Sequence, residues 1–352
     1  MNVPTRNRRV KVIRNGAAII VAAVVVSGIV YEQVGRWRDR KLYAQIGRSV
    51  DIGGRTLNIF CSGEGYPTVI FDSGGHTAGY SWISIQPQVA KFTRACWYDR
   101  AGYGWSDPGP RPRTSRAVVN DLQALLHAAA IPSPYVLVGA TPAFHVRVYN
   151  GLHPADVAGV VLIDPTSPDA FAYEPQFMKG PMESRPPYVK TVECMVVKPA
   201  MLRLGLYRLF WKLRGPRRLG ATNLTPDQQA ELYFLSDTPL AQTGAEGCDV
   251  DESMAEVRAS GNFGNRPLIV LTSENPFEAP SPAEAKATEA YNEIWVHKLQ
   301  PQIAGLSTRG RQVVVKNGNF GIQYEAPGAV IDAIRMVVTE IREERGKTAR
   351  QP

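Results

Sequence analysis

The sequence has few of the residues that hold metal ions or form reactive thiol pairs. It contains four cysteines and five histidines in 352 residues, and no two cysteines form a Cys-x-x-Cys pair. A zinc site or a thioredoxin-like motif is therefore not expected, and we expect neither a metal nor a cofactor. Cys61 and Cys96 lie in two expected strands, where a disulfide and two buried free thiols are both compatible with the sequence. Cys194 and Cys248 are the other two cysteines.

Outside the N-terminus the chain has no surplus of positive charge, although the whole chain carries a net charge of +8. Residues 1–48 hold ten Lys and Arg against two Asp and Glu, and the rest of the chain holds thirty of each sign. The globular part is therefore neutral. We expect no nucleic-acid binding, because the basic residues belong to the N-terminal segment.

The chain has a single long apolar run, from Asn15 to Tyr31, between a basic segment (1–14) and a second basic stretch (36–41). As a helix this run rises about 25 Å, the short end of what crosses a bilayer when flanking Arg side chains snorkel. We predict a single-pass anchor over residues 15–34 that binds membrane lipid. A cleaved signal peptide and a buried core helix are the alternatives. The flanking charges slightly favour a globular domain outside the cytoplasmic membrane.

Apolar strands alternate with helices from residue 48 onward. A hairpin is expected over 48–61, and further strands over 68–72, 94–99, 135–139, 159–164, 267–273 and 311–317. Helices are expected over 80–92, 117–131, 282–306, 326–345 and from Phe144. Continuously apolar strands separated by helices indicate a parallel sheet that is covered on both faces.

The alternation stops near Pro165 and resumes at about residue 263. We predict an α/β core over 46–165 and 263–345, interrupted by a largely helical cap over 166–262. Within the cap, residues 198–220 mix aromatic and aliphatic side chains with Arg and Lys. Such a helix can lie on an anionic membrane surface or pack its apolar side over a pocket.

One joint between a strand and a helix bears most directly on function. The strand "YVLVG" is followed by Ala140, Thr141, Pro142 and Ala143, and helical spacing begins at Phe144. This is the position at which the G-x-S-x-G pattern places a nucleophilic serine.

Several motifs together resemble the α/β-hydrolase fold superfamily, notably its membrane-anchored bacterial branch. They are "GEGYPTVIFDSGG", "CWYDRAGYGWSDPGP", "YVLVG", "VAGVVLIDPTSPD" and "IQYEAPGAVIDAI". The resemblance implies a mostly parallel sheet of eight strands with helices on both faces. It implies that the second strand lies beside the fourth, which makes the strands of Cys61 and Cys96 neighbours. It also implies a nucleophile after the fifth strand, an acid after the sixth or seventh, and a histidine after the eighth.

The expected catalytic positions are degenerate. Thr141 stands at the nucleophile position, where its β-branch fits a strained elbow poorly. Pro142 follows it and has no N–H, so the main oxyanion-hole donor is missing, although Gly74 and Gly75 after the third strand could supply the second. Where the histidine is expected, the chain has Asn319 or Phe320, and neither can act as a general base.

The acid position is occupied. Asp164 ends the sixth strand and is the acid candidate, with Glu274 after the seventh strand as the second choice. Asp164 is equally compatible with a purely local role, in which it caps the turn through Pro165.

These losses favour a membrane-anchored protein without the standard triad that acts as a binding or regulatory module. The alternative is an active hydrolase of carboxylic esters or amides, with a rearranged site in which Thr141 or Ser73 is paired with His76. His145 is expected to pack beneath the elbow. A small apolar or ester-like ligand is compatible with the fold, and the sequence identifies no protein partner.

Overall fold

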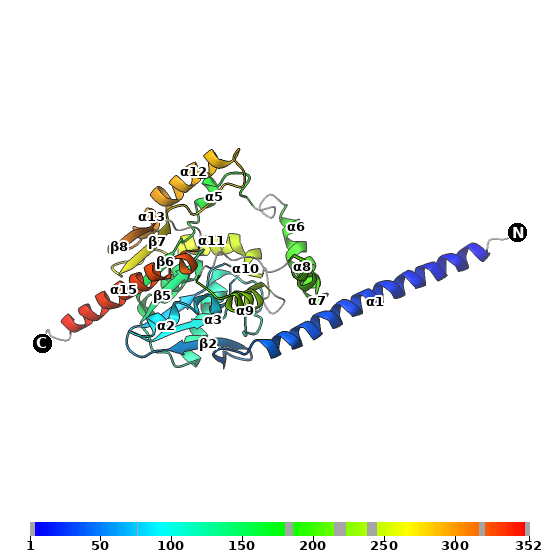
Figure 1. Cartoon of the computed structure of the whole chain (residues 1–352), viewed down its shortest axis with the longest axis horizontal. Helices are drawn as coiled ribbons and strands as arrows, with labels where there is room; N and C mark the ends of the chain where they lie inside the picture. Colours follow the sequence, from blue (N-terminus) through cyan, green and yellow to red (C-terminus); the bar gives the residue numbers. More distant parts are fainter. Residues whose placement is uncertain are drawn as a thin grey trace.

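The computed structural model describes residues 4–75, 77–179, 186–214, 223–237, 245–316 and 321–348. Within these ranges the chain forms one sheet in the order β1-β2-β4-β3-β5-β6-β7-β8 (Figure 1). β2 pairs antiparallel with β1 and β4, and all other pairs are parallel, which confirms the predicted mostly parallel sheet. The strands are β1 (Arg48–Asp51), β2 (Thr56–Ser62), β3 (Thr68–Asp72), β4 (Ala95–Tyr98), β5 (Tyr135–Ala140), β6 (Val157–Ile163), β7 (Leu268–Ser273) and β8 (Gly310–Val315).

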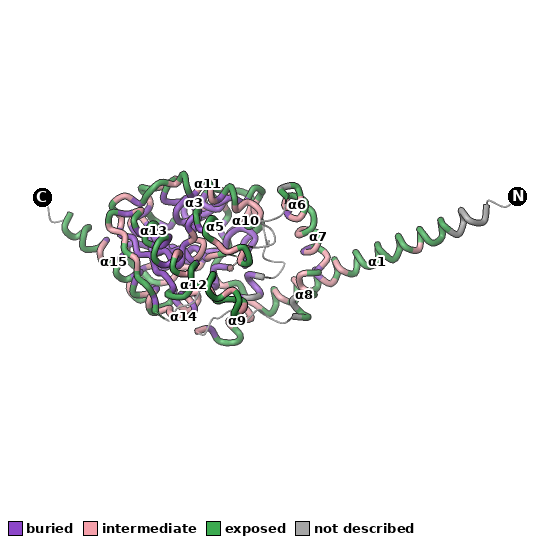
Figure 2. The backbone as a smooth tube through the Cα atoms, turned by 90° about the horizontal axis from the view of Figure 1, so that it is seen from above, coloured by how far each residue is buried: buried purple, intermediate pink, exposed green. Residues whose placement is uncertain are grey.

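Both faces of the sheet are covered by helices, as the continuously apolar strands predicted. Successive strand residues point to opposite faces. In β6, Val160 and Leu162 pack in the cluster that includes helices α3 (Ser115–Ala128), α4 (Phe144–Leu152) and α11 (Val250–Ala259). Val161 and Ile163 pack in the cluster that includes α2 (Gln86–Val89) and α15 (Pro327–Thr348). Figure 2 shows the resulting buried interior.

The helices of the α/β core mostly follow the expected segments, with one break. The segment expected as one helix over 80–92 instead forms a 3₁₀ turn (Gly79–Trp82) and the short α2. Pro87 accounts for the break, because its ring clashes with the preceding helical turn and it has no N–H. The core helices are α2 (Gln86–Val89), α3 (Ser115–Ala128), α4 (Phe144–Leu152), α12 (Ala285–Ile294), α13 (Gln300–Ala304), α14 (Ile322–Glu325) and α15 (Pro327–Thr348), with a 3₁₀ turn (Pro154–Asp156) before β6 and a π-helix (Trp295–Leu299) joining α12 to α13.

The chain between β6 and β7 contributes no strand to this sheet in its described residues, and we call this segment the insertion. A disulfide joins Cys194, in a π-helical turn (Glu193–Val197), to Cys248 in α10. The helices of the insertion are α5 (Ala170–Tyr173), α6 (Pro187–Val192), α7 (Lys198–Arg203), α8 (Leu206–Arg214), α9 (Pro226–Asp237), α10 (Ala245–Cys248) and α11 (Val250–Ala259).

The N-terminal helix α1 (Pro4–Leu42) projects away from the sheet (Figures 1 and 2). It is the one described helix that is long and apolar enough to cross a membrane, and no part of its most apolar window is buried. The alternative of a buried core helix is therefore wrong. A signal sequence would have the same length and composition.

The contact between α1 and the insertion lies at the sheet-proximal end of α1. The carboxylate of Glu32 accepts hydrogen bonds from Arg36 within α1, at 2.8 Å, and from Arg208 in α8, at 3.0 Å. A Cβ at Gly28 would lie 2.7 Å from the carbonyl oxygen of Leu204, in the α7–α8 turn. The insertion and α1 thus meet through backbone as well as through charged side chains.

The two strand cysteines are bonded. Cys61 of β2 and Cys96 of β4 are register partners with Cα atoms 4.1 Å apart, and their sulfurs form a disulfide. The expectation that these residues lie on neighbouring strands is confirmed, and the bond decides between the two alternatives that the sequence left open.

Candidate functional site

The candidate site lies where the carboxyl ends of four neighbouring parallel strands meet. Asp72 pairs with Gly139 at the ends of β3 and β5, and Ile163 pairs with Ala140 on one side and Leu271 on the other. This register brings the residues that follow each strand to one edge of the sheet, the edge at which open α/β sheets bind ligands.

The joint between β5 and α4 has the predicted strand-turn-helix form. β5 ends at Ala140 and α4 begins at Phe144. Strand and helix pack closely, because a Cβ at Gly139 would lie 2.7 Å from Cγ2 of Val146. The left-handed residue of the turn is Ala143, with φ 58°, rather than Thr141. The left-handed conformation of this turn therefore does not fall on Thr141, whose β-branch would fit it poorly.

The Thr141 hydroxyl is bonded to backbone. It donates to the carbonyl oxygen of Asp164 at 2.8 Å and to that of Ile163 at 3.1 Å. A nucleophilic hydroxyl must instead donate its proton to a base that removes it. In this arrangement Thr141 connects the elbow to the end of β6.

The expected oxyanion region presents a carbonyl oxygen. A Cβ at Gly74 would overlap the carbonyl oxygen of Thr141, so the elbow and the loop after β3 touch through backbone. Pro142 has no N–H, and the N–H of Ala143 donates to the carbonyl oxygen of Ala140 at 2.9 Å. The two positions that follow Thr141 therefore offer no free donor to a substrate oxygen.

Arg100, from the "YDRAGYG" motif, fixes the loop after β3. Its guanidinium donates to the carbonyl oxygens of Ser73 and of Gly75, the latter at 2.6 Å. Its Nε lies 3.1 Å from both carboxylate oxygens of Glu246 in α10. Burial alone would lower the pKa of Arg100, but its electrostatic interactions with Glu246, Tyr103 and Asp72 together outweigh burial, and the pKa is raised. Arg100 thus connects the loop to the insertion.

Asp164, the acid candidate, bonds to the neighbouring strand. Its carboxylate accepts a hydrogen bond from the N–H of Ser273 at 2.8 Å and another from the Ser273 hydroxyl. Burial raises the pKa of Asp164 to about 6, although the hydrogen bonds from Ser273 oppose the shift. The Asp164 backbone has a positive φ of 43°. The second candidate, Glu274, lines a separate cavity with Phe277 and His297.

An unpredicted pair joins α4 to the end of β3. Nδ1 of His145, in the first turn of α4, is 2.9 Å from Oδ2 of Asp72, and the Tyr98 hydroxyl donates to Oδ1 at 2.7 Å. Burial would raise the pKa of Asp72, but its interactions with His145, with Arg100 and with the Tyr98 hydroxyl together hold it below the ordinary value. His145 thus joins the first turn of α4 to the end of β3. Asp72, a polar residue at the end of the otherwise apolar strand β3, is the sequence signal that could have indicated this partner of His145.

Three of the predicted positions lie outside the described residues. They are His76, the alternative base, and Asn319 and Phe320, which stand where the histidine is expected. Ser73, which was considered as an alternative nucleophile, is described and buried. Its hydroxyl donates to the carbonyl oxygen of Ala78 at 3.0 Å and lies 3.1 Å from the hydroxyl of Ser81.

The raised pKa of Asp164 predicts a specific pH dependence of stability. An unfolded Asp titrates near pH 4, so the folded protein binds the extra proton up to about pH 6. The stability from this proton is complete below pH 4 and is lost as the pH rises through 6. We expect the free energy of unfolding to fall by roughly 2–3 kcal/mol more in wild type than in Asp164→Asn between these limits. Urea titrations of both proteins at pH 4 and pH 7 measure this, and equal pH slopes would contradict it.

Comparisons with known sequences match parts of the chain. No protein-family model matches it. It is 24% identical over 157 residues to protein YbdG of Bacillus subtilis, covering 44% of this chain and 48% of that protein. A stretch of 141 residues, 36% of this chain, is 32% identical to the probable transporter efuK of Hormonema carpetanum and covers 20% of it. The chain thus spans less than half the length of these curated relatives.

Comparisons with solved structures cover most of the chain. The haloalkane dehalogenase DbeA from Bradyrhizobium elkanii superposes with a TM-score of 0.59 at 17% identity, over 84% of this chain and 98% of that one. An esterase from Thermogutta terrifontis superposes with a TM-score of 0.56 at 18% identity, over 85% and 99%. With the strand order and parallel pairing described above, these likenesses establish that the chain has the α/β-hydrolase fold.

Proposed function

We propose that the chain is a membrane-anchored protein that uses the α/β-hydrolase scaffold as a binding or regulatory module, without the serine-hydrolase reaction. The bonding of Thr141 is the main support. Its hydroxyl donates to two carbonyl oxygens of the β6 end, and its own carbonyl oxygen lies against the loop at Gly74. Catalysis by this fold needs a hydroxyl that is free to attack and N–H donors that face the substrate oxygen.

The absence of a base at the position where the fold places it adds to this support. Asn319 and Phe320 stand where the histidine is expected, and neither accepts a proton near neutral pH. The carboxylate of Asp164 is engaged by Ser273. A nucleophile, an oxyanion donor and a base are separate requirements, so a single compensating change does not restore them.

The alternative is a hydrolase of carboxylic esters or amides with a rearranged site around Thr141, Ser73 and His76. The Asp72–His145 pair is the one observation that favours a rearrangement, because a carboxylate-paired histidine is what a general base requires. The hydroxyls of Ser73 and Thr141 both donate to backbone carbonyl oxygens, which argues against either as the nucleophile.

The ligand class and the compartment are part of the proposal. The solved neighbours are named as a haloalkane dehalogenase and an esterase, so we propose a small apolar or ester-like ligand. Two disulfides support an oxidising compartment, which agrees with a globular domain outside the cytoplasmic membrane.

Substitution at the elbow tests the proposed loss of catalysis. Thr141→Ala is expected to leave any hydrolysis of p-nitrophenyl acetate unchanged within about twofold. Thr141→Ser is expected to gain little, because Pro142 still supplies no N–H; one such donor typically contributes about 10²–10³ in rate. Initial rates of purified full-length proteins measure this. Clear wild-type turnover that disappears in Thr141→Ala would contradict the proposal, and activity lost only in His76→Ala or His145→Ala would favour the rearranged site.

Membrane extraction tests the anchor. Because the apolar window of α1 is unburied, full-length protein is expected to stay in the membrane pellet after carbonate treatment, and deletion of residues 1–40 is expected to release it. Immunoblots of pellet and supernatant measure the distribution. A mature protein whose N-terminus maps near Ile29 would replace the anchor with a cleaved signal peptide.

A further inference from the structure

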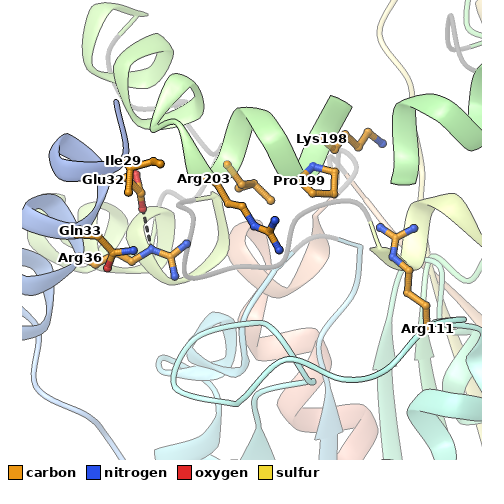
Figure 3. A pocket seen from close by; sticks show the side chains of 9 residues that line it. Ile29, Glu32, Gln33, Arg36, Arg111, Lys198, Pro199 and Arg203 are labelled. Atoms are coloured by element: carbon orange, nitrogen blue, oxygen red, sulfur yellow. Dashed lines mark hydrogen bonds and ion pairs between the residues drawn. The ribbon is translucent and has the colours of Figure 1, made fainter. Parts of the chain in front are cut away.

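A cavity of about 400 Å³ lies between α1 and the insertion, away from the candidate site. Figure 3 shows that its lining comes from three separate segments. Glu32 and Arg36 come from α1, Lys198 and Arg203 from α7, and Arg111 from the loop before α3.

The lining is cationic in balance. Four basic side chains surround it, and Glu32 is its one carboxylate among the described lining residues. Glu32 is 1% exposed and is paired with Arg36 at 2.8 Å and with Arg208 of α8 at 3.0 Å. Its charge is therefore already neutralised. The charges of Arg111, Lys198 and Arg203 are left without a balancing carboxylate in this lining.

The cavity lies along α1 at the height where the helix would leave the membrane. Ile29, which also lines it, belongs to the apolar run, whereas Arg36 lies seven residues further on. Seven helical residues rise about 10 Å, comparable with one headgroup layer of a bilayer, roughly 5–8 Å thick. The cavity therefore extends from the end of the apolar run to the first arginine beyond it.

The insertion contacts α1 at the same height along the helix. The contact of Leu204 with Gly28 places the α7–α8 turn beside the last part of the apolar run. Beyond this turn, α8 keeps Leu209 and Leu213 exposed, and Val196 is exposed just before α7. Exposed apolar side chains next to cations are typical of segments that lie in the interface of a membrane.

We propose that this cavity binds the phosphate of an anionic phospholipid in the leaflet from which α1 emerges. Guanidinium and ammonium groups form charge-assisted hydrogen bonds with phosphate oxygens, and Arg is suited to bidentate contact. The acyl chains would follow the apolar part of α1 and the exposed leucines of α8. The inference rests on the proposed membrane anchoring and adds a specific lipid contact to it.

Native mass spectrometry of the full-length protein in detergent tests the site. The protein is titrated with dioleoyl phosphatidylglycerol and, separately, with dioleoyl phosphatidylcholine. The wild-type protein is expected to retain phosphatidylglycerol in preference to phosphatidylcholine. The double variant, Lys198→Ala with Arg203→Ala, is expected to bind phosphatidylglycerol at least about tenfold more weakly than the wild type. Lys212→Ala, an exposed lysine of α8 outside the cavity lining, is the matched control and is expected to bind as wild type. Circular dichroism checks that all variants are folded.

Three results would overturn the inference. Equal retention of phosphatidylglycerol by the wild type and the double variant would show that Lys198 and Arg203 do not form the site. An equal loss of binding in Lys212→Ala would show that the lipid responds to overall positive charge and not to this cavity. Displacement of the lipid by millimolar inorganic phosphate would assign the cavity to a soluble anion. Release of the wild-type protein by carbonate would instead contradict the membrane anchor itself. Protein that stays in the membrane pellet but shows no preference for phosphatidylglycerol would contradict only the headgroup site.

Discussion

The arrangement of the site depends on one buried guanidinium. Arg100 is 1% exposed, and it donates to the carbonyl oxygens of Ser73 and Gly75 while its Nε faces Glu246. A buried charge without such partners costs several kcal/mol, so these contacts are a strong constraint. They hold the loop after β3 in place and attach α10 to it. Through the disulfide of α10 to the π-helical turn before α7, the same contact connects the sheet to the part of the insertion that meets α1.

With the loop held there, the elbow is closed from two sides. The carbonyl oxygen of Thr141 meets Gly74, and its hydroxyl reaches the end of β6. The hydroxyl is the group that a hydrolase would direct at its substrate, and the carbonyl oxygen lies against the loop that would supply an oxyanion donor. Pro142 makes the arrangement less costly, because it has no N–H that would require a partner. The degenerate elbow is thus a packed joint between three strand ends.

Much of this could be predicted from the sequence, because its signals are local or periodic. The apolar run of α1, the alternating strands and the strand-helix joint at Thr141 all depend on residues close in the chain. The position of the left-handed residue, Ala143, could not be predicted, because turn geometry depends on how the elbow packs. The bond of Asp164 to Ser273 and that of Asp72 to His145 join residues far apart in sequence. They follow from the strand register, which periodicity does not specify.

Covalent labelling tests the central claim, that the elbow of this hydrolase fold is chemically closed, most directly. A fluorophosphonate reacts with a hydroxyl that has a base and an oxyanion hole. The folded full-length protein is incubated with the probe beside a known serine hydrolase, and adducts are mapped by peptide mass spectrometry. The account predicts that the reference enzyme is labelled and that Thr141 and Ser73 are not. Stoichiometric labelling of Thr141 in the folded protein would contradict it.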